Sequence, residues 1–302
     1  MTPCGSVVSN IQSALNALES VQIEVDGIFG QQTVSALATF QTSNNLNVTG
    51  SVTEETWVAL TRCQAPPIFD RCLQMTASFE GTGFTKVVGD FDGAGVTWGI
   101  IGFTLLGGEL GAILADINAR YPGIFARAFG HDATAILNIS SDAVSDADKT
   151  AWADSISRGS SKYAVADPWY TYFHDLGMNP EVQAMQNDRA RDQYWTTALK
   201  DAKALSMNEE LDLMLTFDIA VQNGGMRSKQ RLKNALDAIA NLVNPTPITK
   251  REAVANVVAD SVGRYKADVL SRKLTIAQGG GIIHKANYDL SDWGLANGFP
   301  AT

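Results

Sequence analysis

The sequence has few residues of the kinds that bind metals or cross-link chains. Three cysteines in 302 residues make no disulfide framework, and their spacing matches no zinc motif. Three histidines are scattered without an H-x-H or H-E-x-x-H pair. We therefore expect no metal and no other cofactor. The sequence does not favour a metal-dependent peptidase or amidase.

The three cysteines differ in their sequence context. Cys72 falls on the apolar side of a predicted helix, where a thiol is usually a packing group, so a Cys-His hydrolase is poorly supported. Cys4 and Cys63 flank the N-terminal segment and can pair only if their Cα atoms lie within roughly 7 Å. Reduced thiols are the default for a chain made in the cytoplasm, which leaves this pairing open.

Long apolar runs and a secretory signal are also missing. No run approaches the length that spans a bilayer, so we expect no integral membrane segment. The first residues, "MTPCGSVVSN", lack the basic and apolar regions of a signal peptide. If the protein acts outside the cytoplasm in which it is made, we expect another system to release it.

Basic residues are in the minority. The chain has 23 Lys and Arg against 32 Asp and Glu, a net charge of −9, and no basic stripe with interleaved aromatics. Of the basic residues, 15 lie between Arg189 and Lys285, where solvated helix faces explain them. We therefore expect no nucleic-acid partner.

What is present predicts a globular chain of two domains. The hydrophobic fraction of 45% and charged fraction of 18% suit packed cores, and the length favours one small and one large domain. Apolar residues recur at helical spacing through the first sixty positions, until Pro66-Pro67 interrupts the pattern. The predicted organisation is a small domain at 1–63, a linker at 64–68 and a large domain at 69–302.

The small domain carries an ordered set of landmarks. They are "VDGIFGQQTVSALATFQ" and, further on, "VTGSVTEETWVAL". This segment resembles the widespread peptidoglycan-binding module, on the residues Asp26, Gly27, Phe29, Gly30, Thr33, Gln41 and Trp57. The resemblance implies a three-helix fold and contacts to glycan through Asp26, Thr33 and Trp57, whereas Phe29 and Leu37 are expected in the core. A generic three-helix scaffold is the alternative, since fold alone does not establish binding.

The large domain is predicted to be mostly helical. Periodic apolar segments occur near 69–80, 107–119, 181–204, 208–222, 229–243 and 250–272. A polar stretch at 133–161, rich in small residues, fits either a lobe edge or a partly helical flap.

Two carboxylates stand on either side of a glycine-rich excursion in "FEGTGFTKVVGDFDGAGVTWGIIGFT", residues 79–104. Glu80 ends a predicted helix, where the negative end of the helix dipole and the apolar neighbour Phe79 both favour the protonated acid. Asp92 lies in a polar glycine turn open to water. A pair of acids in such different environments is typical of glycoside cleavage, although Asp-Gly is also a common turn.

The residues after Asp92 strengthen this interpretation. "DGAGVTWGIIGFT" at 92–104, "QNDRARDQYW" at 186–195 and "LTFDIAVQNGG" at 215–225 resemble blocks of the chitosanase-like glycoside hydrolases of the lysozyme superfamily. The resemblance implies a two-lobed, mainly α-helical domain with a short β-hairpin. It also implies Glu80 as general acid, Asp92 as general base and Thr97 as the hydroxyl that positions the attacking water.

Three departures from that family's pattern affect the expected substrate. Glu80 and Asp92 are only 12 positions apart (92 minus 80), Ala94 replaces an arginine, and Asn223 replaces a histidine. Chitosan is therefore in doubt as the substrate, while the acid pair is retained. Asp90 is the second candidate for the base because it lies outside the D-G-x-G frame.

Further polar residues are candidates for substrate contacts. Asp218 and Gln222, four apart on one helix face, fit either a sugar site or buried structural hydrogen bonding, and Asn223 follows them. His284 and Tyr288 belong to a glycine-rich segment, "QGGGIIHKANYDLSDWGL", which we expect to be a loop that touches substrate. This segment is no phosphate cradle, because it lacks the following Lys-Ser/Thr.

Together the two resemblances imply a protein that binds bacterial cell wall and cuts its glycan strands. The expected activity is a muramidase-type, inverting hydrolysis of peptidoglycan by a monomer, as in a modular phage endolysin made in the host cytoplasm and released to the wall. The alternatives are a chitosanase-like or chitinase-like hydrolase, an injected antibacterial effector and a non-catalytic wall-binding structural protein.

Overall fold

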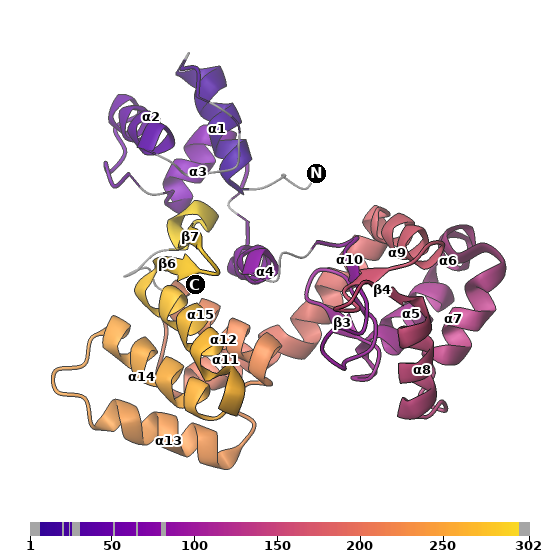
Figure 1. The fold of residues 1–302 in the computed structure, drawn as a ribbon. Coiled ribbons are helices and arrows are strands. Elements are labelled where there is room, and N and C mark those ends of the chain that lie inside the picture. The colour runs from indigo at the N-terminus through magenta and orange to yellow at the C-terminus, as the bar shows by residue number, and fades with distance from the viewer. Residues whose placement is uncertain are drawn as a thin grey trace. The chain divides into compact units, whose positions relative to one another are not determined.

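The computed structural model describes residues 7–19, 21–23, 25, 31–50, 52–64, 66–79 and 83–295. The fold is mainly helical, as predicted, with short strands in three small antiparallel sheets rather than one hairpin (Figure 1). None of the helices in these described ranges is long and apolar enough to cross a membrane.

The chain forms two compact units that do not follow the linear division expected from the sequence. Unit 1 contains residues 1–75 and 194–302, and unit 2 contains residues 76–193. The large segment 69–302 is therefore split, because the chain leaves unit 1 within its fourth helix and returns at residue 194.

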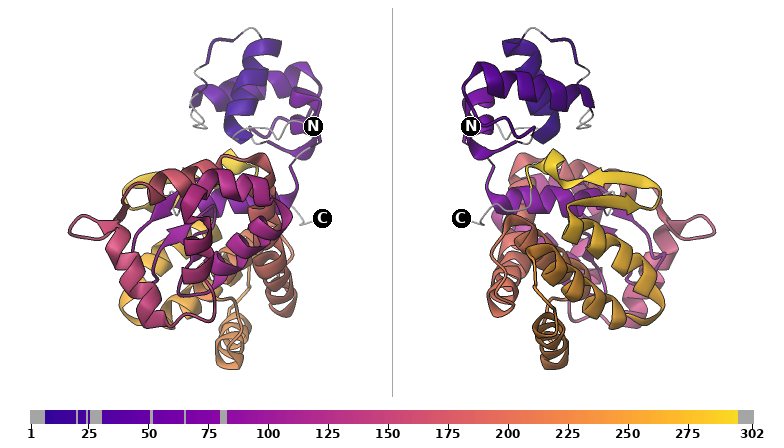
Figure 2. Two further views of the ribbon diagram at one scale, coloured as in Figure 1. Left: turned by 90° about the vertical axis from the view of Figure 1, so that its right-hand side faces the viewer. Right: turned by 90° about the vertical axis from the view of Figure 1, so that its left-hand side faces the viewer.

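Three helices build the N-terminal part of unit 1 (Figure 2). They are α1 (Val7–Leu18), α2 (Gln31–Ser43) and α3 (Glu54–Thr61). Their core holds Leu15, Leu37, Phe40 and Trp57, which confirms Leu37 as a core residue; Phe29 lies outside the described residues.

A buried glutamine fixes the connection between α2 and α3. The Gln41 amide donates to the hydroxyls of Thr49 and Thr56 at 3.2 and 3.1 Å. Its Oε1 accepts from the backbone N–H groups of Thr49 and Gly50, both at 3.1 Å. Because this one buried side chain bonds several groups of the α2-α3 connection, the Phe-Gln landmark has a structural explanation.

The rest of unit 1 is a helical bundle followed by a hairpin. Its elements are α4 (Ile68–Phe79, which continues into unit 2), α11 (Thr196–Ala204), α12 (Glu210–Asn223), α13 (Lys229–Ala240), α14 (Pro247–Asp260), α15 (Lys266–Gln278), β6 (Gly280–Ile283), β7 (Ala286–Asp289) and η4 (Leu290–Trp293). The segment expected as one helix at 250–272 is two, since the chain turns at Ser261–Gly263. The glycine-rich segment expected as a loop pairs as the antiparallel strands β6 and β7.

Buried side chains join these helices. Phe69 of α4 packs edge-on against Trp195 and Phe217, with ring centroids 5.6 and 5.8 Å apart. Cys72 on the same helix is fully buried, as predicted, and burial raises the pKa of its thiol. Cys63 is exposed, and Cys4 lies outside the described residues, so their pairing stays a prediction.

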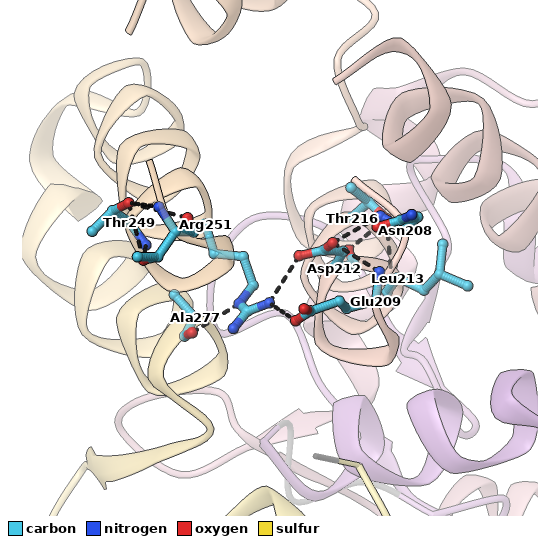
Figure 3. Close-up of polar contacts among 9 residues, drawn as sticks. Asn208, Glu209, Asp212, Leu213, Thr216, Thr249, Arg251 and Ala277 are labelled. Atoms are coloured by element: carbon cyan, nitrogen blue, oxygen red, sulfur yellow. Dashed lines mark hydrogen bonds and ion pairs between the residues drawn. The ribbon is translucent and has the colours of Figure 1, made fainter. Parts of the chain in front are cut away.

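A fully buried arginine ties α14 to α12 and α15 (Figure 3). Arg251 donates to Glu209 Oε2 at 3.0 Å, to Asp212 Oδ1 at 2.9 Å and to the Ala277 carbonyl at 2.8 Å. Glu209 and Asp212 also form the capping box at the start of α12. The charge is thus compensated inside the bundle, as a buried guanidinium requires.

Unit 2 combines short strands with helices. Its elements are β1 (Val87–Val88), β2 (Thr97–Trp98), β3 (Phe103–Thr104), α5 (Glu109–Arg120), α6 (Pro122–Phe129), η1 (Gly130–Asp132), α7 (Ala133–Ile139), α8 (Asp146–Ile156), β4 (Ser157–Arg158), β5 (Ala164–Val165), α9 (Trp169–Gly177) and α10 (Pro180–Ala190). A π-helical turn, η2 (Arg191–Trp195), follows α10. The polar stretch 133–161 is therefore mainly helical, and it ends in a strand.

The strands of unit 2 pack on an aromatic core. Trp98 of β2 is fully buried, and its indole N–H donates to the Phe173 carbonyl at 3.0 Å. Phe129 packs against Phe125 and Phe173, with centroids 4.8 and 5.5 Å apart. This core holds the sheet β1-β2-β3, whose β1-β2 connection carries Asp92 and its rival Asp90.

Candidate functional site

The predicted general base lies in the glycine-rich connection between β1 and β2. Asp92 is exposed, and its Oδ1 accepts from the Ala94 N–H at 3.1 Å, so the loop forms an Asx turn. Gly93 and Gly95 have φ angles of +85° and +77°, which favour glycine at both positions. Glu80, the predicted acid, lies outside the described residues.

Asp90, the rival candidate, has a different environment. Only 7% of it is exposed, and its Oδ1 accepts from the Gly95 N–H at 2.9 Å. Its own N–H donates to Ser157 Oγ at 2.9 Å. Asp90 closes the loop from inside while Asp92 faces solvent, so the geometry favours Asp92 as the carboxylate that reaches a water or a substrate.

Thr97 stands five residues after Asp92, at the start of β2. It is half-buried and pairs with Thr104 across the β2-β3 ladder. A Cβ atom added to Gly102 would lie 3.1 Å from Thr97 Cγ2, so the glycine leaves the room this side chain occupies. The hydroxyl is held on a strand rather than on the loop, which suits a positioning role.

A third carboxylate lies near this sheet and was not singled out from the sequence. The Thr104 hydroxyl donates to Glu109 Oε2 at 3.0 Å, in the first turn of α5. The only sequence signal was an acidic residue at the start of a predicted helix, which is common at helix N-termini for electrostatic reasons alone.

A buried glutamine fixes the turn between β2 and β3. Gln186 of α10 is fully buried; its Oε1 accepts from the Ile100 N–H at 2.9 Å, and its Nε2 donates to the Phe84 carbonyl at 3.1 Å. A Cβ on Gly99 would lie 2.5 Å from that Oε1. The glycines after Thr97 and the block at 186–195 are therefore linked by one contact.

Asp218 and Gln222, proposed for substrate, are held in a buried ion cluster of unit 1. Asp218 is 0% exposed and accepts from Arg272 at 2.6 and 3.0 Å and from Lys273, which also donates to Gln222 Oε1 at 2.7 Å. Burial alone would raise the pKa of Asp218, but the charges of Arg272 and Lys273 outweigh it and lower this pKa to about 2. The structural alternative is therefore the better explanation of Asp218.

The remaining candidates of unit 1 are spread over two elements. Asn223 ends α12, and its Oδ1 is buried without a hydrogen-bond partner among the described residues. His284 is exposed in the β6-β7 turn with φ +49°, and its Nε2 lies 2.6 Å from Asp268 Oδ1. Tyr288 of β7 stacks on Trp293, with centroids 6.4 Å apart. Unit 1 does not gather these three side chains around Asp218.

In the N-terminal helices, two predicted glycan contacts are core residues. Thr33 is buried, and its hydroxyl accepts a hydrogen bond from Gln12 Nε2 at 3.3 Å. Trp57 is buried as well, and its indole N–H donates to the Gln64 carbonyl at 3.0 Å. Neither side chain is placed to touch a polymer at the surface. Asp26 lies outside the described residues.

The outer face of α2 carries a surface depression instead. Its volume is about 400 Å³, and Val21, Ile23, Gln31, Ser35 and Thr39 line it. The two aliphatic residues come from the connection that follows α1, and the three polar ones project from α2. The lining residues that the structure describes are uncharged, which suits a neutral ligand with small apolar groups.

No group of His, Cys, Asp or Glu that could hold a metal ion is found within the described ranges. Of the two acids in the β1-β2 connection, Asp92 is exposed to solvent and Asp90 is fixed in the loop.

Comparison with known proteins assigns the N-terminal helices. Residues 4–60 match the family described as putative peptidoglycan binding domain. We refer to them below as the wall-binding module. No curated protein sequence matches the chain.

Solved structures resemble the larger part. A mutant chitosanase from Bacillus subtilis MY002, complexed with 6 GlcN, is 13% identical with a TM-score of 0.50, covering 75% of this chain and 97% of that one. A GH46 chitosanase from Gynuella sunshinyii in complex with chitotetraose is 15% identical with a TM-score of 0.47, covering 72% and 88%. The fold that the chain shares with the first of these structures is therefore chitosanase-like.

Proposed function

We propose that this protein binds bacterial peptidoglycan through the wall-binding module and hydrolyses glycosidic bonds of its glycan strands. The family match supports the first step, and the chitosanase-like fold is compatible with the second. The observation that carries the proposal is the D-G-A-G connection, in which Asp90 and two glycines hold Asp92 at the surface.

The proposed mechanism is an inverting displacement. Glu80 protonates the oxygen of the leaving sugar while Asp92 takes a proton from water, and that water attacks the anomeric carbon from the opposite face. Thr97 positions the water by a hydrogen bond. Such a reaction releases a product of inverted anomeric configuration, which proton NMR of a fresh digest detects.

The depression on α2 is the proposed site of wall binding. Residues 1–63 contain five acids (Glu19, Glu24, Asp26, Glu54, Glu55) and one base (Arg62), a formal balance of −4. Carboxylate-bearing stem peptides are therefore disfavoured, and the described lining residues, which carry no charge, suit the neutral sugars of the glycan. Apolar residues of the depression can cover the methyl of an N-acetyl group.

The proposed biological role is that of an endolysin: a bacteriolytic monomer, made in the host cytoplasm, that reaches the wall after release. An injected effector has the same chemistry. The chitosanase-like fold keeps hydrolysis of a glucosamine polymer as the second candidate activity.

Zymography on purified sacculi tests the proposal. Glu80→Gln keeps the side-chain shape but removes the transferable proton, so turnover should fall by about two to four orders of magnitude. Glu181→Gln, an exposed acid at the start of α10, is the matched control and should retain activity. Mass spectrometry of the reducing ends identifies the bond that is cut.

Lytic activity that survives Glu80→Gln unchanged contradicts the acid assignment. A wild-type chain that binds sacculi and cuts no glycan supports the non-catalytic wall binder, and one that cuts only glucosamine polymer supports the chitosanase.

A further inference from the structure

An exposed aromatic pair includes the residue that precedes the proposed base. Phe91, the residue before Asp92, is 48% exposed, and Tyr163 is 44% exposed. Their rings meet edge to face, with centroids 5.3 Å apart. Large aromatic side chains usually bury most of their area, so an adjacent exposed pair indicates a binding surface.

The backbones that carry the two rings are fastened together. The Gly89 N–H donates to the Tyr163 carbonyl at 2.9 Å, and Ser157 Oγ, which accepts from Asp90, donates to the Ala153 carbonyl at 2.7 Å. A Cβ on Gly89 would collide with the Lys162 carbonyl oxygen, so only glycine permits this approach. The β4-β5 turn and the loop of the base therefore form one rigid support, which reduces the entropy lost on binding.

Cationic groups border the pair. Lys86 Nζ lies 5.6 Å from the centroid of the Tyr163 ring, and Lys162 bonds Asp154 at 2.5 Å. The hydrogen bond to Asp154 raises the pKa of Lys162, which keeps this amine charged. Asp154 compensates the charge of Lys162, so the repulsion comes from the Lys86 ammonium beside the Tyr163 ring, which disfavours the protonated amine of glucosamine. An N-acetylated sugar carries no charge at that position.

We propose that Phe91 and Tyr163 form a stacking platform for an N-acetylated pyranose of the glycan strand, next to the bond that Asp92 helps to cut. The apolar C–H face of the sugar covers an aromatic face, and both are removed from water. The Tyr163 hydroxyl makes no hydrogen bond to another described residue and is available to a sugar hydroxyl. The inference rests on the proposed function and adds to it a choice of acetylated over free-amine sugar.

Binding and turnover are measured separately on the full chain. An N-acetylglucosamine oligomer and the glucosamine oligomer of equal length are titrated by calorimetry into the Asp92→Asn protein, which holds substrate without cutting it. Adding Phe91→Ala should lower the affinity for the acetylated oligomer about 5- to 30-fold, whereas adding Phe91→Tyr should leave this affinity unchanged. Tyr170→Ala is the control, since Tyr170 is equally exposed, at 48%, on α9 of the same unit. Thermal unfolding of each variant shows that it is folded.

The kinetic form of the test uses the otherwise unchanged enzyme on soluble glycan fragments. Phe91→Ala should raise KM about 5- to 30-fold and change kcat less than about twofold. Lys86→Met should reduce the ratio of kcat/KM for the acetylated oligomer to kcat/KM for the glucosamine oligomer. Equal affinity of Phe91→Ala and Tyr170→Ala for the acetylated oligomer overturns the platform and leaves the proposed hydrolysis standing. Tighter binding of the glucosamine oligomer to the parent protein overturns the sugar assignment. Platform-dependent binding without any cutting of sacculi supports the platform and rejects the hydrolysis.

Discussion

Two aspartates two residues apart differ in accessibility, and the roles proposed for them rest on this difference. Asp90 is withdrawn into the loop, where it accepts from Gly95, whereas Asp92 is exposed beyond the turn. A single sequence cannot distinguish them by residue type. The distinction follows from the backbone, because the turn at Gly93 and Gly95 directs one carboxylate inward and the other outward.

We therefore predict that substitution of Asp92 mainly lowers activity, whereas substitution of Asp90 mainly lowers stability. Asp92→Asn removes the group that takes the proton from water, so kcat should fall about 10²- to 10⁴-fold with little loss of stability. Asp90→Ala leaves the Gly95 N–H without its acceptor and should cost about 1–3 kcal/mol of unfolding free energy, measured by urea denaturation. Asp90→Asn keeps a side-chain oxygen that can accept from the Gly95 N–H, so it should lose less stability than Asp90→Ala. It should also lose less kcat than Asp92→Asn. Loss of activity in Asp90→Asn, together with retained activity in Asp92→Asn, identifies Asp90 as the base instead.

The buried ion cluster of unit 1 makes a second prediction at the residue scale. Asp218 compensates both Arg272 and Lys273, so Asp218→Asn leaves buried positive charge and should lower the unfolding free energy at pH 7 by about 3–5 kcal/mol. Asp116→Asn is the control: its carboxylate is exposed on α5 and pairs with Arg189, so the change should stay within about 0.5 kcal/mol.

The same cluster sets a pH dependence. The folded pKa of Asp218, about 2, lies below its unfolded value, so the ionised group adds stability that is complete above roughly pH 4 and is lost as the pH falls toward 2. The difference between wild type and Asp218→Asn should therefore shrink between pH 5 and pH 2.5. A difference that stays constant over this range is the contrary result.

At the scale of elements, α2 presents one face to the core of the wall-binding module and another to the depression. The buried face carries Thr33, Leu37 and Phe40, and the depression is lined from the same helix by Ser35 and Thr39. Family landmarks therefore identify the fold better than the binding surface, because several of them are residues that pack.

Two substitutions on α2 test whether the depression binds the cell wall. Ser35→Arg introduces a long charged side chain into an uncharged site and should weaken sacculus binding at least about tenfold in a co-sedimentation assay. Thr42→Arg is the control, since Thr42 is exposed on the same helix and does not line the depression. Cleavage of soluble glycan should be unchanged in both variants, and equal binding by both places the wall site elsewhere on the module.

Much of the helical framework was predictable, because apolar spacing and capping residues are local signals. The segment predicted at 107–119 is α5 at 109–120, and that at 208–222 is α12 at 210–223. The break at Ser261–Gly263 was missed, since apolar residues recur at helical spacing on both sides of it. The β6-β7 hairpin was missed because its glycines indicate a loop, although Gly281 lies against Thr275, where little room is left for a side chain.

The candidate site was predictable only in part, for a related reason. The D-G-x-G frame shows in the letters, so Asp92 and Thr97 could be singled out. The burial of Asp218 could not, because its partners Arg272 and Lys273 are more than fifty positions away. The pairing of Phe91 with Tyr163 is likewise a long-range contact that only the fold creates.

At the scale of the whole molecule, the proposed binding and the proposed cutting belong to different segments of the chain. Among the described residues, the buried core of the wall-binding module comes from α1, α2 and α3, and the proposed base belongs to unit 2. Tethering a binder to a hydrolase raises the local concentration of substrate without altering the chemistry. The two activities should therefore be separable.

Deletion of residues 1–63 makes that separation measurable. Because the module has a hydrophobic core of its own, its removal should leave the remaining chain folded, with soluble glycan fragments cut at a rate within about twofold of the full chain. Turnover of intact sacculi should fall by about 10²-fold or more at low enzyme concentration, since the effective concentration supplied by the tether is lost. This loss should shrink as enzyme concentration rises, because free encounters then replace tethered ones. A truncated chain that is folded by circular dichroism but inactive on soluble glycan contradicts the separation, and means that residues 1–63 take part in catalysis rather than in delivery to the wall.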